Sequence, residues 1–299
     1  MNKDLISVND LSLKEIQAIF SLTDKLKKNK GKFSGVLKGK TLALIFQKPS
    51  NRTRVSFQVG MYQLGGNCMY LSPGEINLGI RETIVDVAKT LSRYVDGIVL
   101  RTFAHENILE MARHATIPII NGLSDFSHPC QALADIYTVK ERLKTFKGKL
   151  LVYVGDGNNV CNSLLFACMK VGLKINVATP KGFEPAKIAQ EEASGIAKIF
   201  SDPFQAVKGA DVVYTDVWAS MGQEKEAQER KMIFKDFQIN SRLMSLAKKD
   251  ALVMHCLPAH RGEEITDEVI DSKNSIVFDQ AENRLHVQKA ILIKLLGES

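Results

Sequence analysis

Short apolar runs rich in β-branched residues alternate along the chain with segments of helical periodicity. The runs lack strict apolar–polar alternation, which is typical of strands buried on both faces of a parallel sheet. The predicted strands lie at 41–46, 67–71, 97–100, 116–120, 150–154, 174–178, 196–200, 211–215, 251–255 and 275–278.

The segments between these runs are predicted to be helices. In 52–64, for example, Val55, Val59 and Tyr62 fall at i, i+4 and i+7 on one face. Regular alternation of strands and helices indicates a doubly wound α/β architecture. The first helix (about 11–28) and the last (about 280–296) lie outside this alternation.

The length of 299 residues predicts two domains, at roughly 100–200 residues each. The boundary is expected in the charged stretch 140–149, where a long helix gives way to a new strand. We therefore expect a first domain over 1–147 and a second over 148–299, with the last helix a candidate for packing back on the first domain. The predicted fold is two doubly wound parallel-sheet domains with the active site in the cleft between them.

Composition narrows the class of protein. Hydrophobic residues make up 45% and charged residues 24%, which is ordinary for a globular chain and argues against disorder. The net charge of +7 is consistent with a lysine-rich surface or with a basic field that attracts small anionic substrates. The basic residues are scattered and form no aromatic-interleaved patch, so no nucleic-acid partner is expected.

The cysteines and the hydropathy indicate a compartment. Five cysteines in a chain of this length form no disulfide framework, and the number is odd. The first residues do not have the apolar core of a secretion signal, and no apolar run approaches the roughly 20 residues that span a bilayer. We therefore expect a cytoplasmic protein with no membrane partner.

Polar residues cluster where predicted strands end. Ligands of open parallel sheets bind beyond the carboxyl ends of the strands, so these clusters are expected to converge on one cleft. The six clusters lie at 48–54, 101–102, 127–131, 155–159, 216–222 and 255–258.

The segment Ser50-Asn51-Arg52-Thr53-Arg54 follows a strand and opens a helix. Ser50 or Asn51 can cap that helix, which leaves free N–H groups and the positive end of the helix dipole beside two guanidinium groups. Such an arrangement predicts an anion site, and the planar fork of arginine suits phosphate. The glycine-rich stretch of a P-loop is missing.

The segment His128-Pro129-Cys130-Gln131 opens a second helix, with Pro129 suited to its first turn. A histidine at the positive end of a helix has its protonated form disfavoured. His128 is therefore predicted to act as a neutral hydrogen-bond donor to a carbonyl group.

The sequence does not contain the pattern of two common kinds of cofactor site. The segment Gly155-Asp156-Gly157-Asn158-Asn159 follows a strand but lacks the third glycine and the acidic residue of a dinucleotide site. No cysteine or histidine pairs have the spacing of zinc ligands. We therefore expect neither a metal nor another cofactor.

Taken together, these motifs resemble the aspartate/ornithine carbamoyltransferase family. The Ser-x-Arg-Thr-Arg element at 50–54 and the His-Pro-x-Gln element at 128–131 are signatures shared across that family. Two further motifs, Asp216 with Ser220-Met221-Gly222 and His255-Cys256-Leu257-Pro258, are similar to those of its ornithine branch. The resemblance extends from the first helix to the Ala281–Arg284 segment.

The resemblance implies an activity and a set of roles. The activity is transfer of the carbamoyl group of carbamoyl phosphate to the side-chain amine of L-ornithine, giving L-citrulline and phosphate in arginine metabolism. The implied catalytic residues are Arg101, His128, Asp216 and Cys256. Carbamoyl phosphate would be held by Ser50, Asn51, Arg52, Thr53, Arg101, His128 and Gln131, with Cys256, Leu257 and Arg284 closing the site from the second domain. Ornithine would meet Asn159, Asp216, Ser220 and Met221.

Two residues depart from the family pattern. Asn51 replaces the commonest residue, threonine, although asparagine still caps a helix. Asn77 stands where many relatives carry glutamine, in the loop 72–81 that reaches the site of a neighbouring subunit. The resemblance therefore implies a homotrimer, or a higher oligomer of trimers, in which Asn77 contributes to carbamoyl phosphate binding across the interface.

The chemistry of the residues agrees with these roles. Attack by an amine builds negative charge on the carbonyl oxygen and then on the departing phosphate, where Arg52, Arg101 and His128 supply electrostatic stabilisation. Asp216 and Cys256 can bind the amine and assist its deprotonation. Aspartate or a diamine such as putrescine is an alternative acceptor. A nucleotide-dependent dehydrogenase and a catalytically silent binding protein are alternatives from other classes.

Overall fold

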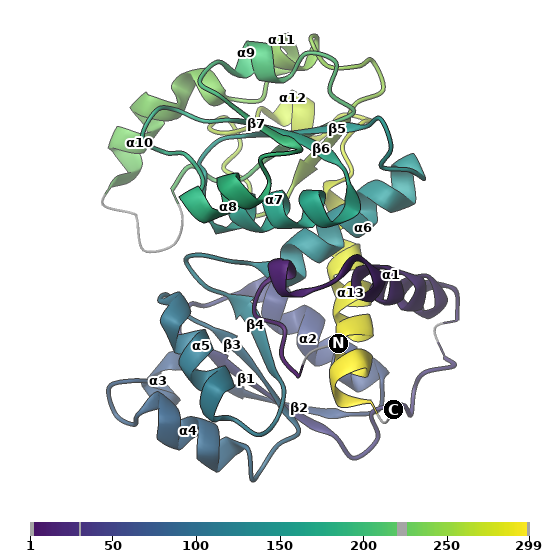
Figure 1. Ribbon diagram of the computed structural model, residues 1–299, viewed down its shortest axis with the longest axis vertical. Helices are drawn as coiled ribbons and strands as arrows, with labels where there is room; N and C mark the ends of the chain where they lie inside the picture. The colour runs from purple at the N-terminus through teal and green to yellow at the C-terminus, as the bar shows by residue number, and fades with distance from the viewer. Residues whose placement is uncertain (1–2, 30, 220–225, 298–299) are drawn as a thin grey trace. The chain divides into compact units, whose positions relative to one another are not determined.

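The computed structural model describes residues 3–29, 31–219 and 226–297 (Figure 1). The chain divides into two compact units, the first formed by Met1–Tyr137 with Glu282–Ser299 and the second by Thr138–Ala281. The chain passes between the units within helix α6 (Pro129–Leu143) and again within α13 (Val277–Leu296). The sequence predicts a domain boundary after residue 147, beyond the end of α6. In the structure the two units instead divide between Tyr137 and Thr138, inside α6.

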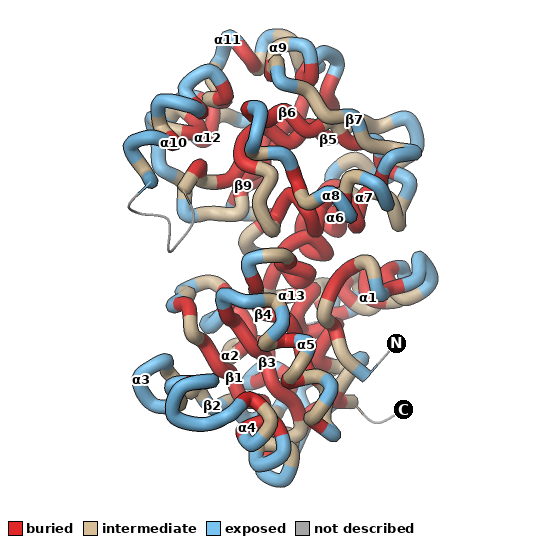
Figure 2. Tube along the Cα trace, turned by 60° about the vertical axis from the view of Figure 1, so that its left-hand side comes forward, coloured by how far each residue is buried: buried red, intermediate tan, exposed pale blue. Residues whose placement is uncertain are grey.

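The first unit contains a sheet of four parallel strands in the order β2-β1-β3-β4. Each pair is parallel, with Ile45 opposite Leu100 at the centre of the sheet. The two central strands are buried almost throughout (Figure 2). The strands are β1 (Thr41–Phe46), β2 (Asn67–Leu71), β3 (Gly97–Arg101) and β4 (Ile119–Leu123).

Helices cover both faces of this sheet. Figure 1 shows α4 (Ile84–Leu91) and α5 (His105–His114) on one face, where they pack against alternate strand residues such as Ile45 and Ile98. On the other face lie α2 (Asn51–Gln63) and α13, which pack side by side at Gly60 and Lys289. The remaining helices are η1 (Val8–Asp10), α1 (Leu13–Lys28) and α3 (Pro73–Ile76).

The second unit contains a sheet of five parallel strands in the order β7-β6-β5-β8-β9. Tyr153 lies opposite Tyr214, and Thr215 lies opposite His255. This register places the last residues of three neighbouring strands at one edge. The strands are β5 (Leu150–Val154), β6 (Lys174–Ala178), β7 (Ala197–Phe200), β8 (Val212–Thr215) and β9 (Leu252–His255).

One face of the second sheet carries α7 (Asn159–Val171) and α8 (Lys187–Glu192), as Figure 1 shows. On the other face, an apolar core joins strand residues such as Val152 and Val213 to Phe234 and Leu243 of the covering helices. Those helices are α9 (Pro203–Ala206), α10 (Ala227–Phe234), η3 (Lys235–Phe237), α11 (Ser241–Met244) and α12 (Asp267–Ile270).

The structure confirms the doubly wound α/β prediction and nine of the ten predicted strands, the largest shift being from 116–120 to Ile119–Leu123. The tenth, 275–278, is wrong. Ser275 makes a single parallel bridge to Val253, and helix α13 begins at Val277. A short apolar run does not distinguish a strand from the first turn of a buried helix.

The predicted apolar face of helix 52–64 turns outward. Val55 is 48% exposed and Tyr62 is 82% exposed, whereas Phe57 and Met61 are fully buried. The helix therefore packs on the sheet through a face rotated from the one that the periodicity indicated. In the described part of the chain, no helix combines the length and apolar character needed to cross a membrane.

Candidate active site

In the residues that the structure describes, the six polar clusters lie at the carboxyl ends of strands, as the sequence predicts; residues 220–222 of the fifth cluster lie outside these residues. Three follow β1, β3 and β4, which are neighbours in the first sheet. The other three follow β5, β8 and β9, which are neighbours in the second sheet. Each unit therefore gathers three clusters at one edge of its own sheet.

Helix α2 opens directly after β1 and presents its amino terminus at that edge. Ser50 is the N-cap, and its hydroxyl accepts a hydrogen bond from the Thr53 N–H at 3.2 Å. The first turn contains no acidic residue, so the positive end of the helix dipole is not neutralised locally. Asn51 is exposed and Arg52 half-buried at this turn, as an anion site requires.

Arg284 joins this turn to helix α6. Its guanidinium donates to the Thr53 hydroxyl at 3.1 Å and to the side-chain oxygen of Gln131. The Gln131 amide in turn donates to Asp135 at 2.8 Å. Arg284 was expected to come from the second domain, and that expectation is wrong, because the chain returns to the first unit at Glu282.

His128 lies at the start of α6 and is only 5% exposed. Burial lowers the pKa of His128 well below its ordinary value, and the guanidinium groups of Arg284, Arg101 and Arg52 lower it further. The histidine is therefore neutral near pH 7 and can donate a hydrogen bond without adding a positive charge. The charges of three guanidinium groups therefore act on this one imidazole.

This depressed pKa has a consequence for stability. Below the ordinary histidine pKa of about 6.5, the unfolded chain takes up a proton at His128 and the folded chain does not, so acidification favours unfolding. Lowering the pH from 7.5 to 5.5 should therefore lower the free energy of unfolding through His128, by on the order of 1 kcal/mol. In His128→Gln, the free energy of unfolding should differ less between pH 7.5 and pH 5.5 than it does in the wild type. Urea unfolding at the two pH values measures this difference. An unchanged difference would contradict the buried neutral state.

The loop that carries Asn77 is anchored beside the end of β1. The Gln47 amide donates to the carbonyl of Leu78 at 3.0 Å, and Leu78 is buried. Asn77 is exposed and adopts a left-handed conformation with φ of 41°, which asparagine tolerates better than most residues. Two residues after the buried Leu78, Ile80 is 82% exposed. The loop therefore presents a polar and an apolar side chain outward.

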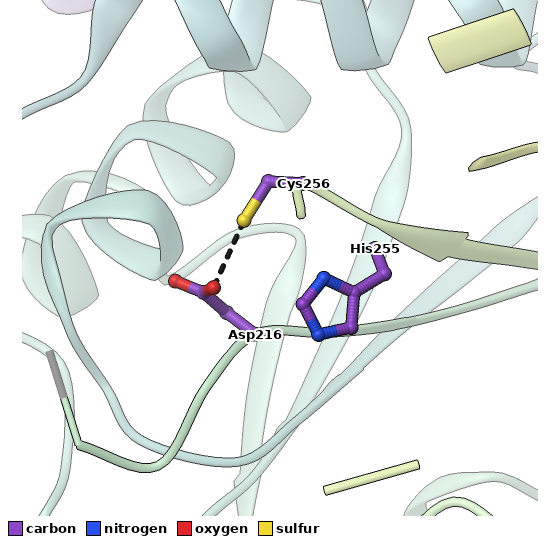
Figure 3. Close-up of side chains that lie close together, drawn as sticks. All are labelled: Asp216, His255 and Cys256. Atoms are coloured by element: carbon purple, nitrogen blue, oxygen red, sulfur yellow. Dashed lines mark hydrogen bonds between the residues drawn. The ribbon is translucent and has the colours of Figure 1, made fainter. Parts of the chain in front are cut away.

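In the second unit, Asp216 and Cys256 are in direct contact (Figure 3). The Cys256 thiol donates to Oδ1 of Asp216 at 2.9 Å, and the Val217 N–H donates to the same oxygen at 2.8 Å. Asp216 is 6% exposed, while Cys256 is half-buried. A carboxylate and a thiol side by side can hold an amine and take part in its deprotonation.

His255 lies beside this pair but both its ring nitrogens are occupied. Nε2 is 2.9 Å from Oε1 of the fully buried Glu264. Nδ1 accepts the N–H of Leu257 at 2.9 Å, so Nε2 carries the proton and donates it to Glu264. Leu257 has φ of 58°, which is uncommon for leucine. The histidine thus holds the backbone that follows Cys256.

Two groups of side chains have the composition of metal ligands. Asp216, His255 and Cys256 offer ligand atoms within 4.8 Å of one another, as do His260, Glu263 and Glu264. A metal in the first group would have to displace the hydrogen bonds of His255 described above. In the second, Lys231 already pairs with Glu263 at 2.7 Å. The sequence did not reveal either group, because their members do not have zinc-ligand spacing.

The expected ornithine contacts are only partly within the described residues. Asn159 opens helix α7 directly after β5 and is half-buried beside Asn158, which caps that helix. Ser220 and Met221 lie outside the residues that the structure describes.

A buried ion pair joins the segment after β5 to helix α10. Asp156 pairs with Arg230 at 3.0 Å, and Arg230 also donates to the carbonyl of Trp218 at 2.9 Å. Burial raises the pKa of Asp156 to about 6, against the opposing effect of Arg230. This pair fixes the start of the segment that follows Asp216.

Two side chains that the sequence analysis did not single out contact predicted site residues. Asp135 receives the Gln131 amide, and Asn158 donates to Oδ2 of Asp216 at 2.9 Å. The spacing of four between Gln131 and Asp135 on one helix was an available signal. Asn158 is separated from Asp216 by 58 residues, so no local sequence pattern indicates this contact.

Comparisons with known proteins agree with this arrangement. The profile of the aspartate/ornithine carbamoyltransferase carbamoyl-P binding domain matches residues 3–141, and that of the Asp/Orn binding domain matches residues 147–295. The chain is 55% identical to an ornithine carbamoyltransferase of Thermococcus kodakarensis (99% of this chain, 96% of the relative) and 52% identical to one of Bacillus subtilis (99% and 95%). Its structure is similar to that of ornithine carbamoyltransferase from Pyrococcus furiosus, with a TM-score of 0.95 and 53% identity (98% of this chain, 96% of that chain).

Proposed function

The chain belongs to the aspartate/ornithine carbamoyltransferase family, and we propose that it transfers the carbamoyl group of carbamoyl phosphate to the side-chain amine of L-ornithine. The products are L-citrulline and phosphate. The observation that carries this function is that each unit has the side chains suited to one of the two substrates. The first unit has a neutral histidine on which three guanidinium charges act, and the second has a carboxylate in contact with a thiol.

The first unit supplies the residues for carbamoyl phosphate. The N–H groups at the start of α2, with Ser50, Asn51, Arg52 and Thr53, bind the phosphate group. Arg101 and His128 donate to the carbonyl oxygen, where charge develops as the amine attacks. Gln131 and Arg284 complete the set, and their mutual hydrogen bond holds both side chains at the start of α6 and α2.

The second unit supplies the residues for the amine. A side-chain amine of this kind is mostly protonated near pH 7, with a pKa of about 10.4 in a free lysine, and only the neutral amine attacks. Asp216 and Cys256 receive the ammonium group and assist loss of its proton. The nitrogen lone pair then forms the new C–N bond, the C–O bond to phosphate breaks, and phosphate leaves with the bonding electrons. Asn159, Ser220 and Met221 hold the amino-acid end, and Cys256 and Leu257 complete the carbamoyl phosphate site.

The direct experiment combines the purified protein with carbamoyl phosphate and ornithine. Citrulline and inorganic phosphate should appear in equal amounts, above the spontaneous decay of carbamoyl phosphate. Release of phosphate without citrulline, or no turnover at all, would contradict the proposed function.

We also propose a homotrimer in which Asn77 completes the phosphate site of a neighbouring subunit. The support is a set of exposed apolar side chains on the first unit, Val55 and Tyr62 of α2 and Met69 of β2, together with the exposed Asn77 and Ile80 of the anchored loop. Sites at head-to-tail contacts are expected in such a closed ring.

All five cysteines are free, which fits a reducing cytoplasm.

Subunit sharing predicts complementation between two inactive variants. Asn77→Glu should place a carboxylate near the neighbour's phosphate, and Arg52→Ala removes the cation from the subunit's own site. Refolding the two variants together creates some interfaces with an intact Arg52 on one subunit and an intact Asn77 on the next. Those mixtures should recover measurable citrulline formation. No recovery in mixtures that native mass spectrometry shows to contain hybrid trimers would contradict the sharing.

A further inference from the structure

Asp216 is held by three hydrogen-bond donors, and they divide between its two oxygens. Oδ1 accepts the Val217 N–H at 2.8 Å and the Cys256 thiol at 2.9 Å. Oδ2 accepts the Nδ2–H of Asn158 at 2.9 Å. Across the described residues, Asn158 is the side chain that fixes the second oxygen, and therefore the rotation of the carboxylate about its own axis.

The orientation of the Asn158 amide is itself determined by the start of helix α7. Its Oδ1 accepts the N–H of Val160 at 2.9 Å and that of Cys161 at 3.1 Å. Backbone N–H groups can only donate, so the amide oxygen must face them and the NH₂ must face Asp216. The Tyr153 hydroxyl, fully buried, lies 3.4 Å from the same oxygen. An amide whose oxygen accepts hydrogen bonds is also a stronger donor at its nitrogen.

These contacts leave Asp216 with limited capacity for a substrate. An ionised carboxylate has about four acceptor sites, and the three donors occupy three of them. The remaining site can accept one N–H from an amine. A second carboxylate brings acceptors only and can make no hydrogen bond there.

We propose that Asn158 is a positioning residue for amine attack, which transmits the fixed direction of helix α7 to the Asp216 carboxylate. This inference rests on the proposed function, in which Asp216 receives the ornithine amine. Asn158 needs no contact with substrate for this role. Without its Nδ2–H, the carboxylate turns about its own axis, the single free acceptor site moves, and the bound amine is no longer oriented for attack.

The test separates the donor of Asn158 from its capping oxygen. Asn158→Asp keeps an oxygen that caps α7, because aspartate caps helices as well as asparagine does. It replaces the donor by a second carboxylate oxygen facing Asp216. Misplacement of a reacting group by about 1 Å costs roughly 100-fold, so kcat/KM for ornithine should fall at least ~100-fold. The KM for carbamoyl phosphate should stay within about threefold, because the phosphate residues lie in the first unit.

Two further variants complete the design. Asn158→Ser keeps a capping oxygen and removes the donor without adding charge, so kcat/KM for ornithine should fall by about 10-fold. The control is Asn240→Asp, the same substitution at the N-cap of α11 in the same unit, where the side chain accepts the Leu243 N–H at 3.0 Å. That variant should keep wild-type constants. The thermal midpoint and the fraction of folded protein are measured for every variant.

The outcomes are distinguishable. Wild-type protein that forms no citrulline overturns the proposed function and leaves no role for Asn158 in it. Active wild-type protein with both Asn158 variants within threefold on kcat/KM overturns the positioning role. So does a loss that follows the folded fraction and affects both substrates equally, because that pattern belongs to a helix cap alone. If Asn158→Asp does not fold, Asn158→Ser decides between these outcomes.

Discussion

Replacing Arg52 with alanine should lower kcat/KM for carbamoyl phosphate by at least ~1000-fold, at the upper end of what one transition-state donor supplies. Arg52 lies in the first turn of α2 and is one of the three guanidinium groups that act on buried His128. In the proposed function it contacts a phosphate group that is charged before and during the reaction. The KM for carbamoyl phosphate should therefore rise and kcat should fall, both measured by citrulline formation.

The matched control is Arg113→Ala, which removes an exposed arginine from α5 of the same unit. It should leave both constants within twofold. Arg101→Ala offers a contrast, because the carbonyl oxygen gains charge only as the amine attacks, so its main effect should be on kcat. An Arg52→Ala enzyme within threefold of wild type on both constants would remove the phosphate role of the α2 terminus.

Asp216→Asn should reduce kcat/KM for ornithine by about 1000-fold, because it removes the charge that receives the ammonium group and presents an NH₂ to donors. The substitution conserves the shape of the side chain beside Val217 and Cys256. A loss of activity therefore reports the lost charge rather than altered packing. Cys256→Ser should cost at least ~10-fold, since the hydroxyl is a poorer acid than the thiol. The KM for carbamoyl phosphate should change little in Asp216→Asn and should rise in Cys256→Ser, because Cys256 is also proposed to complete the carbamoyl phosphate site.

The pH profile provides a second readout for the same pair. Activity of the wild type should rise from pH 6 to about 8.5 as bound ornithine loses its proton. Cys256→Ser should lower the plateau of that profile. Full activity of Cys256→Ser at every pH would mean that the cysteine only packs in the core. Wild-type kinetic constants in Asp216→Asn would mean that Asp216, at the end of β8, does not bind the amine.

The amino-acid pattern predicts most of this fold because buried parallel strands have a strong signature. The run at 150–154 is apolar on both faces, and it is β5. The run at 275–278 is also apolar apart from Ser275, yet its last two residues open α13, where Val277 is buried and Phe278 is 72% exposed. Similarly, Val55 and Tyr62 form a periodic stripe that lies on the surface, since periodicity shows which residues share a face and not which face is covered.

The candidate site is predictable to the extent that it follows strand ends. Topology brings the segments after β1, β3 and β4 together, and likewise those after β5, β8 and β9. Contacts between those segments are not predictable in the same way. Asn158 with Asp216 and Arg284 with Thr53 join residues 58 and 231 positions apart through single side chains. Nothing in local sequence encodes these pairings, because they depend on the final direction of one helix and one strand.

The most direct test of the central claim compares acceptors at saturating carbamoyl phosphate. Ornithine, aspartate and putrescine are each supplied over a range of concentrations, and the carbamoylated product is quantified. Ornithine should exceed aspartate in kcat/KM by at least ~100-fold, because a second carboxylate beside Asp216 costs several kcal/mol in a buried site. Comparable values of kcat/KM for ornithine and aspartate would contradict an amine site built on Asp216 and Cys256.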